Sequence, residues 1–135
     1  MILDTNILSE LSKPSPDTQV EQWVSSLDEL CISGMTLVEI RYGLLLKKNP
    51  YKEKWFKAIY PALTVMNAWP TMFNDSLEML ERSKKKGVTI DPGDAVIASY
   101  AYFYDVTLVT RNVKDFSGCS IKLYNPFDDT YHSPK

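Results

Sequence analysis

Apolar residues along the chain form two patterns, short aliphatic runs and longer stretches with a helical period. The aliphatic runs predict strands at residues 1–3, 30–33, 107–110 and 121–124. The helical stretches predict helices at residues 5–11, 17–27, 36–48, 51–63, 75–86 and 91–104, with a helical turn at 112–116. Short strands that alternate with longer helices indicate an α/β fold, a three-layer α/β/α sandwich on a short, mainly parallel sheet.

Three details of this pattern are specific enough to test. Thr36 is predicted to open its helix and to place Leu37, Ile40, Leu44 and Leu45 on the buried side. Residues 64–73 are predicted to form an irregular turn plus a strand. The polar, proline-bearing end predicts a frayed tail, so we expect a single domain at residues 1–128 and a flexible tail at 129–135.

Composition agrees with one globular domain. The chain has 135 residues, of which 44% are hydrophobic and 24% are charged. It contains no apolar run of the roughly 20 residues needed to span a bilayer, and no basic segment followed by an apolar one as in a secretory signal. Cys31 and Cys119 stand alone, as reduced thiols do. These features predict a cytoplasmic protein without a membrane partner.

Charge is unevenly distributed. The net charge of −2 gives the whole chain no general attraction for nucleic acid. Two basic clusters nevertheless occur in predicted helices, at residues 47–57 and 82–86. Lysines on exposed helix faces are usually only solvated, so both clusters are weak evidence for a phosphate-binding surface.

One carboxylate, Asp4, follows the first strand directly. Parallel sheets bind ligands beyond the carboxyl ends of their strands, so Asp4 is placed to hold a metal ion or to take part in chemistry. Aspartate is also a common helix N-cap, and this second interpretation fits the same stretch.

Three further acids stand three residues after a potential cap, with the spacing of a capping box. They are Glu39 after Thr36, Asp94 after Asp91, and Asp115 after Asn112. Asp75 and Glu78 have the same spacing, and we assign them no chemistry.

The surroundings of these acids favour more than capping. Asp94 opens the most apolar helix in the chain, and Asp115 follows a strand as Asp4 does. Gly43, in the helix of Glu39, costs about 1 kcal/mol relative to alanine, which predicts a close backbone approach there.

Four segments, in this order, resemble the signature segments of PIN-domain ribonucleases. They are Leu3-Asp4-Thr5-Asn6, Thr36-x-x-Glu39-Ile40-x-x-Gly43, Asp94-x-x-Ile97-Ala98 and Val109-Thr110-Arg111-Asn112-x-x-Asp115-Phe116. Their order and spacing resemble the toxins of VapBC-type toxin–antitoxin pairs, and the ending at residues 123–127 resembles the FitB-like subgroup. The likeness covers residues 1–128, with Ser99 in place of a frequent alanine and a loose fit at residues 69–75.

The resemblance implies a PIN-like fold and a site for Mg²⁺ or Mn²⁺ held by Asp4, Glu39, Asp94 and Asp115. It also implies that Thr5, Asn6, Thr110 and Asn112 hydrogen-bond around these acids. The implied substrate is transfer or ribosomal RNA, and the implied partners are a cognate antitoxin and a second copy in a homodimer. The apolar stripe formed by Trp55, Phe56, Ile59 and Tyr60 is then either core or part of an antitoxin or dimer contact.

The residue chemistry agrees with this. Clustered carboxylates stay ionised only beside a cation, and oxygen ligands favour Mg²⁺ or Mn²⁺. Zinc is excluded as the expected metal because the cysteines are isolated and the only histidine, His132, lies in the tail. The expected reaction is hydrolysis of an RNA phosphodiester bond by an activated water, with either Asp94 or Asp115 orienting or deprotonating it.

Two basic residues near the fourth acid, Arg111 and Lys114, are candidates to bind phosphate, although both also fit as ordinary surface charges. Two other functions fit less well. A haloacid-dehalogenase-like phosphatase needs a second aspartate where Asn6 stands. A catalytically silent PIN-like binding module has no need of all four acids.

Overall fold

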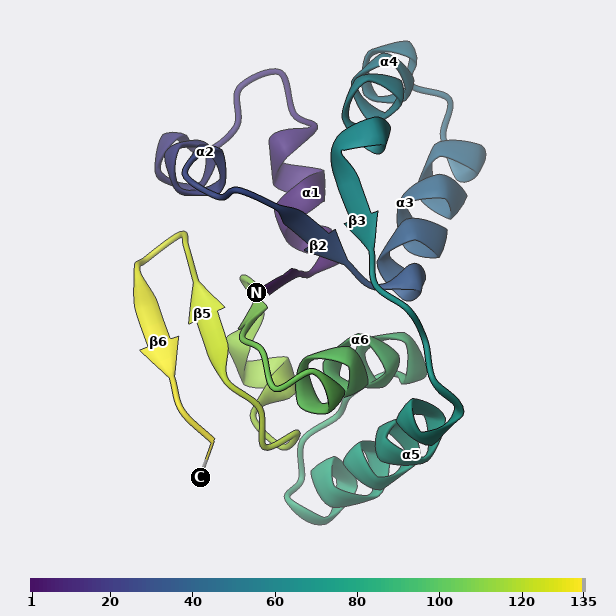
Figure 1. The fold of residues 1–135 in the computed structure, drawn as a ribbon, viewed down its shortest axis with the longest axis vertical. Helices are drawn as coiled ribbons and strands as arrows, with labels where there is room; N and C mark the ends of the chain where they lie inside the picture. The colour runs from purple at the N-terminus through teal and green to yellow at the C-terminus, as the bar shows by residue number, and fades with distance from the viewer. Residues whose placement is uncertain (135) are drawn as a thin grey trace.

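The computed structural model describes residues 1–134 and has one six-stranded sheet in the order β3-β2-β1-β4-β5-β6 (Figure 1). Neighbouring strands are parallel except β5 and β6. The strands are β1 (Ile2–Leu3), β2 (Leu30–Ile32), β3 (Leu63–Val65), β4 (Leu108–Val109), β5 (Leu123–Asn125) and β6 (Thr130–His132). The predicted α/β architecture with a mainly parallel sheet is confirmed.

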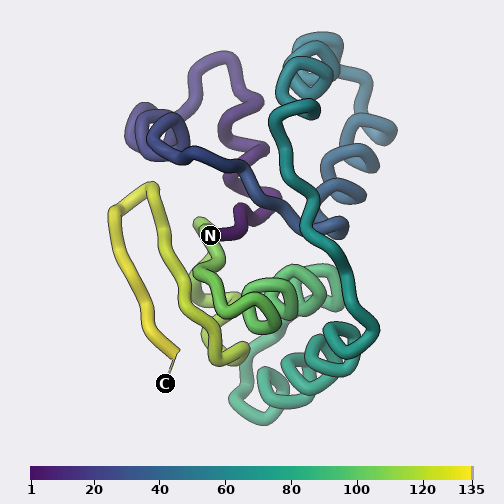
Figure 2. The backbone as a smooth tube through the Cα atoms, viewed as in Figure 1, coloured from purple at the N-terminus to yellow at the C-terminus, as the bar shows by residue number. Residues whose placement is uncertain are grey.

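The order of the strands creates a switch point between β1 and β4. The chain runs outward from β1 to β2 and β3, then returns to β4 on the other side of β1. Ligands of open parallel sheets bind at such a point, beyond the carboxyl ends of the strands. The tube in Figure 2 places the first residues in the middle of the fold, with β5 and β6 at one side.

Helices cover both faces of the sheet (Figure 1). One layer consists of α1 (Thr5–Leu11), α2 (Thr18–Ser25), α3 (Gly34–Leu46) and α4 (Pro50–Ile59). The other consists of α5 (Pro70–Lys85), α6 (Pro92–Phe103) and the 3₁₀ turn η2 (Val113–Phe116). A further 3₁₀ turn, η1 (Tyr60–Ala62), joins α4 to β3. None of the helices within residues 1–134 has the length and apolar character to cross a membrane.

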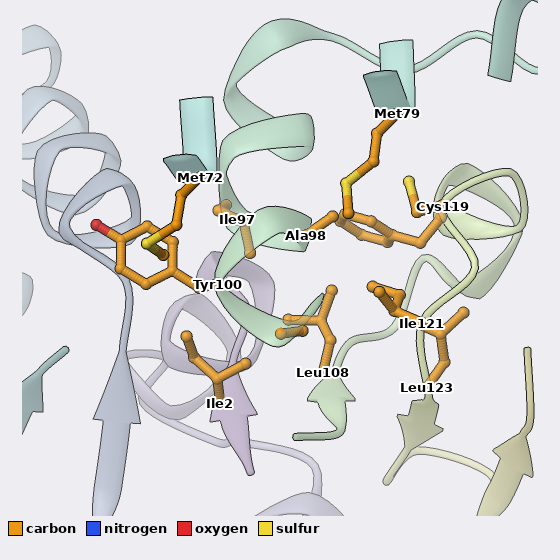
Figure 3. Close-up of a cluster of buried hydrophobic side chains, with 12 residues drawn as sticks. Ile2, Met72, Met79, Ile97, Ala98, Tyr100, Leu108, Cys119, Ile121 and Leu123 are labelled. Atoms are coloured by element: carbon orange, nitrogen blue, oxygen red, sulfur yellow. The ribbon is translucent and has the colours of Figure 1, made fainter. Parts of the chain in front are cut away.

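Alternation along the short strands divides the core in two. Successive side chains of a strand point to opposite faces. Accordingly, Ile2 packs with α5 and α6, whereas the next residue, Leu3, packs with α1 and α2. Leu108 and Leu123 join the core of Ile2, which Figure 3 shows filled by Met72 and Met79 of α5.

The start and the buried side of α3 differ from the prediction. The helix begins at Gly34, and Ser33 caps it by accepting from the Thr36 N–H at 2.9 Å. Thr36 is therefore buried in the first turn and does not open the helix. Leu45 is 82% exposed, because α3 is apolar around most of its circumference and sequence period alone does not select its inner face.

The segment between α4 and α6 also differs. The strand β3 ends at Val65, before the turn, and α5 begins at Pro70 after Trp69, five residues earlier than the predicted start at Asp75. Proline at the first helical position is a sound start signal, because its missing N–H has no helical partner there. Asp75 and Glu78 thus lie inside the helix and cap nothing.

The predicted tail contains a strand. Thr130–His132 pairs antiparallel with β5, and the Tyr131 ring stacks on Tyr124 with centroids 4.3 Å apart. The expectation of a wholly frayed end at 129–135 was wrong for these three residues, because aromatic stacking and main-chain pairing hold them. Residue 135 lies outside the described residues.

Candidate active site

Asp4 lies at the carboxyl end of β1 beside the switch point, and it is 4% exposed. Its Oδ1 accepts from the Thr5 N–H at 2.7 Å. Asp4 is therefore the N-cap of α1, which was one of the two interpretations of this residue from the sequence. Its Oδ2 accepts from the Thr110 hydroxyl at 2.8 Å and from the Asn6 amide at 3.1 Å. The Asp4 carboxylate therefore caps α1 with one oxygen, and its position is fixed by three donors.

A chain of hydroxyl groups connects Asp4 to α3. Thr5 Oγ1 donates to Glu39 Oε1 at 2.8 Å and lies 3.2 Å from Thr36 Oγ1. Thr36 Oγ1 in turn lies 3.2 Å from Ser33 Oγ. Glu39 lies well beyond the first turn of α3, so the capping-box interpretation of Glu39 was wrong. The hydrogen bond from Thr5 instead holds its carboxylate against α1.

Asp94 lies in the first turn of α6, and the Asp91 side chain caps that helix by accepting from the Asp94 N–H at 2.8 Å. Gly93 brings α6 close to α3: a Cβ at Gly93 would lie 3.2 Å from Met35 Cε and 3.9 Å from Glu39 Oε2. The N-terminus of α6, with Asp94, therefore lies beside Glu39.

Asp115 lies on η2, just beyond the carboxyl end of β4. The Asn112 N–H donates to Thr110 Oγ1 at 3.0 Å, which ties this turn to the hydroxyl that holds Asp4. Asn112 makes no side-chain cap of η2, so the capping interpretation fails for the pair Asn112 and Asp115. Asn112 joins the hydrogen-bond network around Asp4 through its main-chain N–H.

The electrostatics place the four carboxylates in one cluster. Burial raises the pKa of Asp4 to about 6, the donors Thr110 and Thr5 oppose this, and the charges of Glu39 and Asp115 add to it. Burial also raises the pKa of Asp94 to about 7, and the charges of Asp91, Asp4, Glu39 and Asp115 raise it further. Acids that lie far apart in sequence thus act on one another at this edge of the sheet.

The donor set fits a hard cation bound partly through water. All nearby ligand atoms are oxygens, as Mg²⁺ and Mn²⁺ prefer. Among residues 1–134, no three histidine, cysteine or acidic side chains stand ready to hold an ion directly. Mg²⁺ usually uses one or two carboxylates and keeps several waters, so this spacing is compatible with it.

The two candidate phosphate-binding residues lie at the rim of the cluster. Arg111 is exposed, its N–H donates to Asn6 Oδ1 at 3.2 Å, and its guanidinium carbon lies 4.6 Å from the centre of the Phe127 ring. Lys114 is exposed on η2, next to Asp115 in sequence. Arg111 thus has a supported position, whereas Lys114 stands free in solvent.

Two features escaped the sequence interpretation. Ser33 was missed, although a serine directly after a strand is a signal for an N-cap. The explanation of Gly43 by close backbone approach was wrong, since a Cβ there would meet no atom within 4 Å.

Comparison of the sequence with models of known protein families gives a match over most of the chain. Residues 1–118 match the family described as PIN domain. The chain is 28% identical to Toxin FitB of Neisseria gonorrhoeae, over 96% of this chain and 99% of that protein. It is 26% identical to VapC ribonuclease Y4jK of Sinorhizobium fredii, over 95% of this chain and 98% of that protein.

Solved structures have the same fold. FitAB bound to a DNA fragment superposes with a TM-score of 0.80 at 24% identity, covering 97% of this chain and 98% of that one. A toxin–antitoxin complex from Klebsiella pneumoniae superposes with a TM-score of 0.71 at 23% identity, covering 93% and 96%.

Proposed function

Because this chain belongs to the PIN-domain family, we propose that it is a divalent-metal-dependent endoribonuclease, the toxin of a type II toxin–antitoxin pair. The observation that carries the proposal is the cluster of Asp4, Glu39, Asp94 and Asp115 at the switch point of the sheet. Family membership excludes the haloacid-dehalogenase-like phosphatase considered from the sequence.

In this proposal the four carboxylates together hold Mg²⁺ or Mn²⁺, some of them directly and the others through bound water. A bound divalent ion supplies a Lewis acid that neutralises phosphate charge and eases the deprotonation of water. Asp4 and Glu39 are the ligands held in place by hydrogen bonds, the first by Thr5, Asn6 and Thr110, the second by Thr5. A ligand fixed in this way loses little conformational freedom on binding.

The remaining carboxylates carry the proton chemistry. Asp94 is half-buried in the first turn of α6, beside Glu39, and is one candidate to take a proton from the attacking water. Asp115, on η2, is the other candidate for this role. Arg111 and Lys114 bind the phosphates that flank the reacting one, and the Phe127 ring holds the Arg111 guanidinium at the rim.

The proposed substrate is single-stranded RNA in a loop of transfer or ribosomal RNA. VapC ribonuclease Y4jK is named for ribonuclease activity, and another relative, from Shigella flexneri, is named a tRNA(fMet)-specific endonuclease. Unpaired loops can be opened toward a site of this kind, whereas stacked duplex cannot. Such a substrate places the site of action in the cytoplasm.

The proposed partners are a cognate antitoxin and a second copy of this chain. The helix α3 and the turn η1 expose large apolar side chains: Tyr42, Leu45, Leu46 and Tyr60. Exposed apolar surface of this extent is typical of a protein interface. An inhibitor that inserts an arginine or lysine among the carboxylates would also neutralise the site.

The test is cleavage of single-stranded RNA by the purified protein with Mg²⁺ or Mn²⁺, with and without a chelator. Asp4→Asn and Asp94→Asn should each lower kcat/KM by about two orders of magnitude or more, since several kcal/mol of charge stabilisation is lost. Asp28→Asn, at an exposed carboxylate outside the cluster, is the matched control. Undiminished cleavage in both site variants would refute the proposed site, and absence of cleavage with retained antitoxin binding would favour the silent module.

A further inference from the structure

The last turn of α5 carries a cluster of basic side chains, which we call the α5 cluster. Its members are Arg82, Lys84, Lys85 and Lys86. The acids of the same helix, Asp75, Glu78 and Glu81, all precede it. The ion pairs within residues 1–134 involve other lysines, so no ion pair neutralises the α5 cluster.

Two members of the cluster share one side of the helix. Arg82 and Lys86 are four residues apart and are therefore neighbours on the helix surface, whereas Lys84 and Lys85 leave α5 in other directions. The Lys86 N–H donates to the Arg82 carbonyl at 3.2 Å, and Gly87 follows with a φ of 71°, as is common where a helix ends. The backbone that carries Arg82 and Lys86 is therefore held in a regular helix end.

Gly118 packs the segment after η2 against this same turn. A Cβ at Gly118 would lie 3.0 Å from Ser83 Cα, so the two backbones approach as closely as only glycine permits. Figure 3 shows the next residue, Cys119, beside Met79 of α5. Lys114 is exposed on η2, four residues before Gly118. The close contact therefore places the segment that begins with Lys114 against the last turn of α5.

The charges of Arg82 and Lys86 act at this contact. Burial raises the pKa of the Cys119 thiol to about 11. The charges of Arg82 and Lys86 lower that pKa, and the charge of Asp94 raises it. Such interactions weaken with distance, so the side of α5 that carries Arg82 and Lys86 is turned to Cys119, and Asp94 lies near the same thiol.

The carboxylate cluster by itself repels RNA. Four ionised carboxylates with one divalent ion leave a net charge of about −2, and each phosphate of a strand adds about −1. Cations beside the cluster offset this repulsion and attract the strand. Arg111 and Lys114 have this place next to the reacting phosphate in the proposed function. Arg82 and Lys86 lie beyond Lys114, across the contact that Gly118 makes.

We propose that the RNA strand passes from the carboxylate cluster over Lys114 to the last turn of α5, where Arg82 and Lys86 bind its phosphates. This inference rests on the proposed ribonuclease function and names the side on which the substrate extends beyond the cut. Continuity with the carboxylate cluster favours RNA over an acidic protein segment, since a substrate must extend from that cluster.

Basic residues at the C-terminus of a helix also interact favourably with the helix dipole. That effect concerns all four members of the α5 cluster alike, whereas phosphate binding concerns the side that carries Arg82 and Lys86. The two explanations therefore predict different results for variants that remove the same charge from different sides of the helix.

The experiment compares two double variants with the same loss of charge at the same helix end. Arg82→Gln with Lys86→Gln alters the proposed phosphate-binding side, and Lys84→Gln with Lys85→Gln is the matched control. Binding of a short fluorescent oligouridylate is measured by anisotropy with a chelator present, over a series of salt concentrations. Thermal unfolding of each variant verifies that it is folded.

We expect Arg82→Gln with Lys86→Gln to reduce the slope of log affinity against log salt by about 1.4, the value for two phosphate contacts to a single strand. Lys86→Gln alone, at an exposed position, should reduce it by about 0.7. The control should keep the slope of the unmodified protein. An equal reduction in both double variants, or no reduction in the first, would overturn the inference.

Cleavage then gives the direction of the strand. Oligoribonucleotides that carry the mapped cleavage site are extended one nucleotide at a time on either side of the cut, and KM is measured with Mg²⁺. We expect KM to fall on extension at one side, and we expect Arg82→Gln with Lys86→Gln to abolish that decrease while the control keeps it. A decrease that the first double variant retains would also overturn the inference.

Two other results separate the inference from the proposed function. If the unmodified protein cleaves no RNA, the nuclease proposal fails, and a slope that Arg82→Gln with Lys86→Gln lowers and the control keeps still supports RNA binding at α5. If Arg82→Gln with Lys86→Gln loses only antitoxin binding and binds RNA as before, the occupant is an acidic protein segment, and the inference is wrong.

Discussion

Thr5 and Glu39, which are separated by 34 positions in the sequence, are joined by a hydrogen bond of 2.8 Å from Thr5 Oγ1 to Glu39 Oε1. The residue before Thr5 is Asp4, whose Oδ1 accepts from the Thr5 N–H. One threonine thus positions two carboxylates, one through its main chain and one through its side chain.

Thr5→Val should separate these two roles, because it keeps the main-chain donor and removes the hydroxyl. A hydrogen bond to a charged group contributes about 1.5–3 kcal/mol, so we expect kcat/KM to fall by about 10- to 100-fold. Thr5→Ser retains the hydroxyl and should restore most of the activity. Initial rates on a single RNA loop measure this, and equal rates for the valine and serine variants would exclude the positioning role of the hydroxyl.

The metal-free protein should lose stability as pH rises from about 4 to about 7. The pKa of Asp4 is about 6 in the folded protein, above its ordinary value of 3.8, so the folded state favours the protonated acid. Ionisation above that pKa opposes folding, by at most about 3 kcal/mol for Asp4. Asp94, with a pKa raised to about 7, acts in the same direction over a slightly higher range.

Urea unfolding at pH 5 and pH 8 without metal measures this dependence. Asp4→Asn cannot ionise, so the difference in unfolding free energy between the two pH values should shrink in that variant. The exposed-site variant Asp28→Asn should behave as the unmodified protein does. An equal pH dependence in Asp4→Asn and the unmodified protein would contradict the raised pKa of Asp4.

Mg²⁺ affinity should fall as pH is lowered through about 7 and then about 6. Protons compete with the cation for Asp94 and Asp4, whose pKa values are raised in its absence. Each proton displaced costs about tenfold in apparent affinity for every pH unit below the pKa concerned. Calorimetric titration between pH 5.5 and pH 8 measures this, and an affinity independent of pH would mean that neither acid holds the metal.

Arg111 should contribute to RNA binding through one phosphate contact. Arg111→Ala should weaken binding and reduce the slope of log affinity against log salt by about 0.7, the value for one contact to a single strand. Lys122→Ala is a matched control, because Lys122 directly precedes β5, at the amino end of that strand, whereas Arg111 lies beyond the carboxyl end of β4, and because Lys122 pairs with Asp105 at 3.0 Å. An unchanged slope in Arg111→Ala would assign the phosphate contact elsewhere.

Gly118 and Gly43 should respond in opposite ways to alanine. A Cβ at Gly118 would lie 2.5 Å from Ser83 Oγ and 3.0 Å from Ser83 Cα, so Gly118→Ala should destabilise the fold by about 1–3 kcal/mol. Ser83→Ala in the same chain removes the nearer atom and should recover part of the loss. Gly43→Ala meets no atom and should stabilise by about 1 kcal/mol. Thermal unfolding of the four proteins measures both effects, and a neutral Gly118→Ala would show that α5 can shift.

The sequence was informative wherever a pattern was local. The runs around Leu3 and Leu108 predicted the central strands, and the strand ends predicted where Asp4 and Asp115 would lie. The potential cap at Asp91 marked the start of α6 correctly. Such features depend on neighbouring residues, which a single sequence contains.

Features that depend on distant segments were missed. The hydroxyl chain from Ser33 to Thr5 forms only because α1 and α3 lie side by side. The start of α5 was misplaced because Asp75 has the form of a cap, while Pro70 follows an aromatic residue that caps poorly. Thr130–His132 forms a strand because it pairs with β5, and no local pattern in residues 130–132 predicts that pairing.

The two residues of β1 link unfolding of the protein to loss of its site. Ile2 belongs to one hydrophobic core, Leu3 to the other, and the carboxylate that follows them anchors the cluster. A fluctuation that detaches this strand would expose both halves of the interior and disperse the acids in one event. Heat inactivation and global unfolding are therefore expected to coincide, without a folded but inactive intermediate.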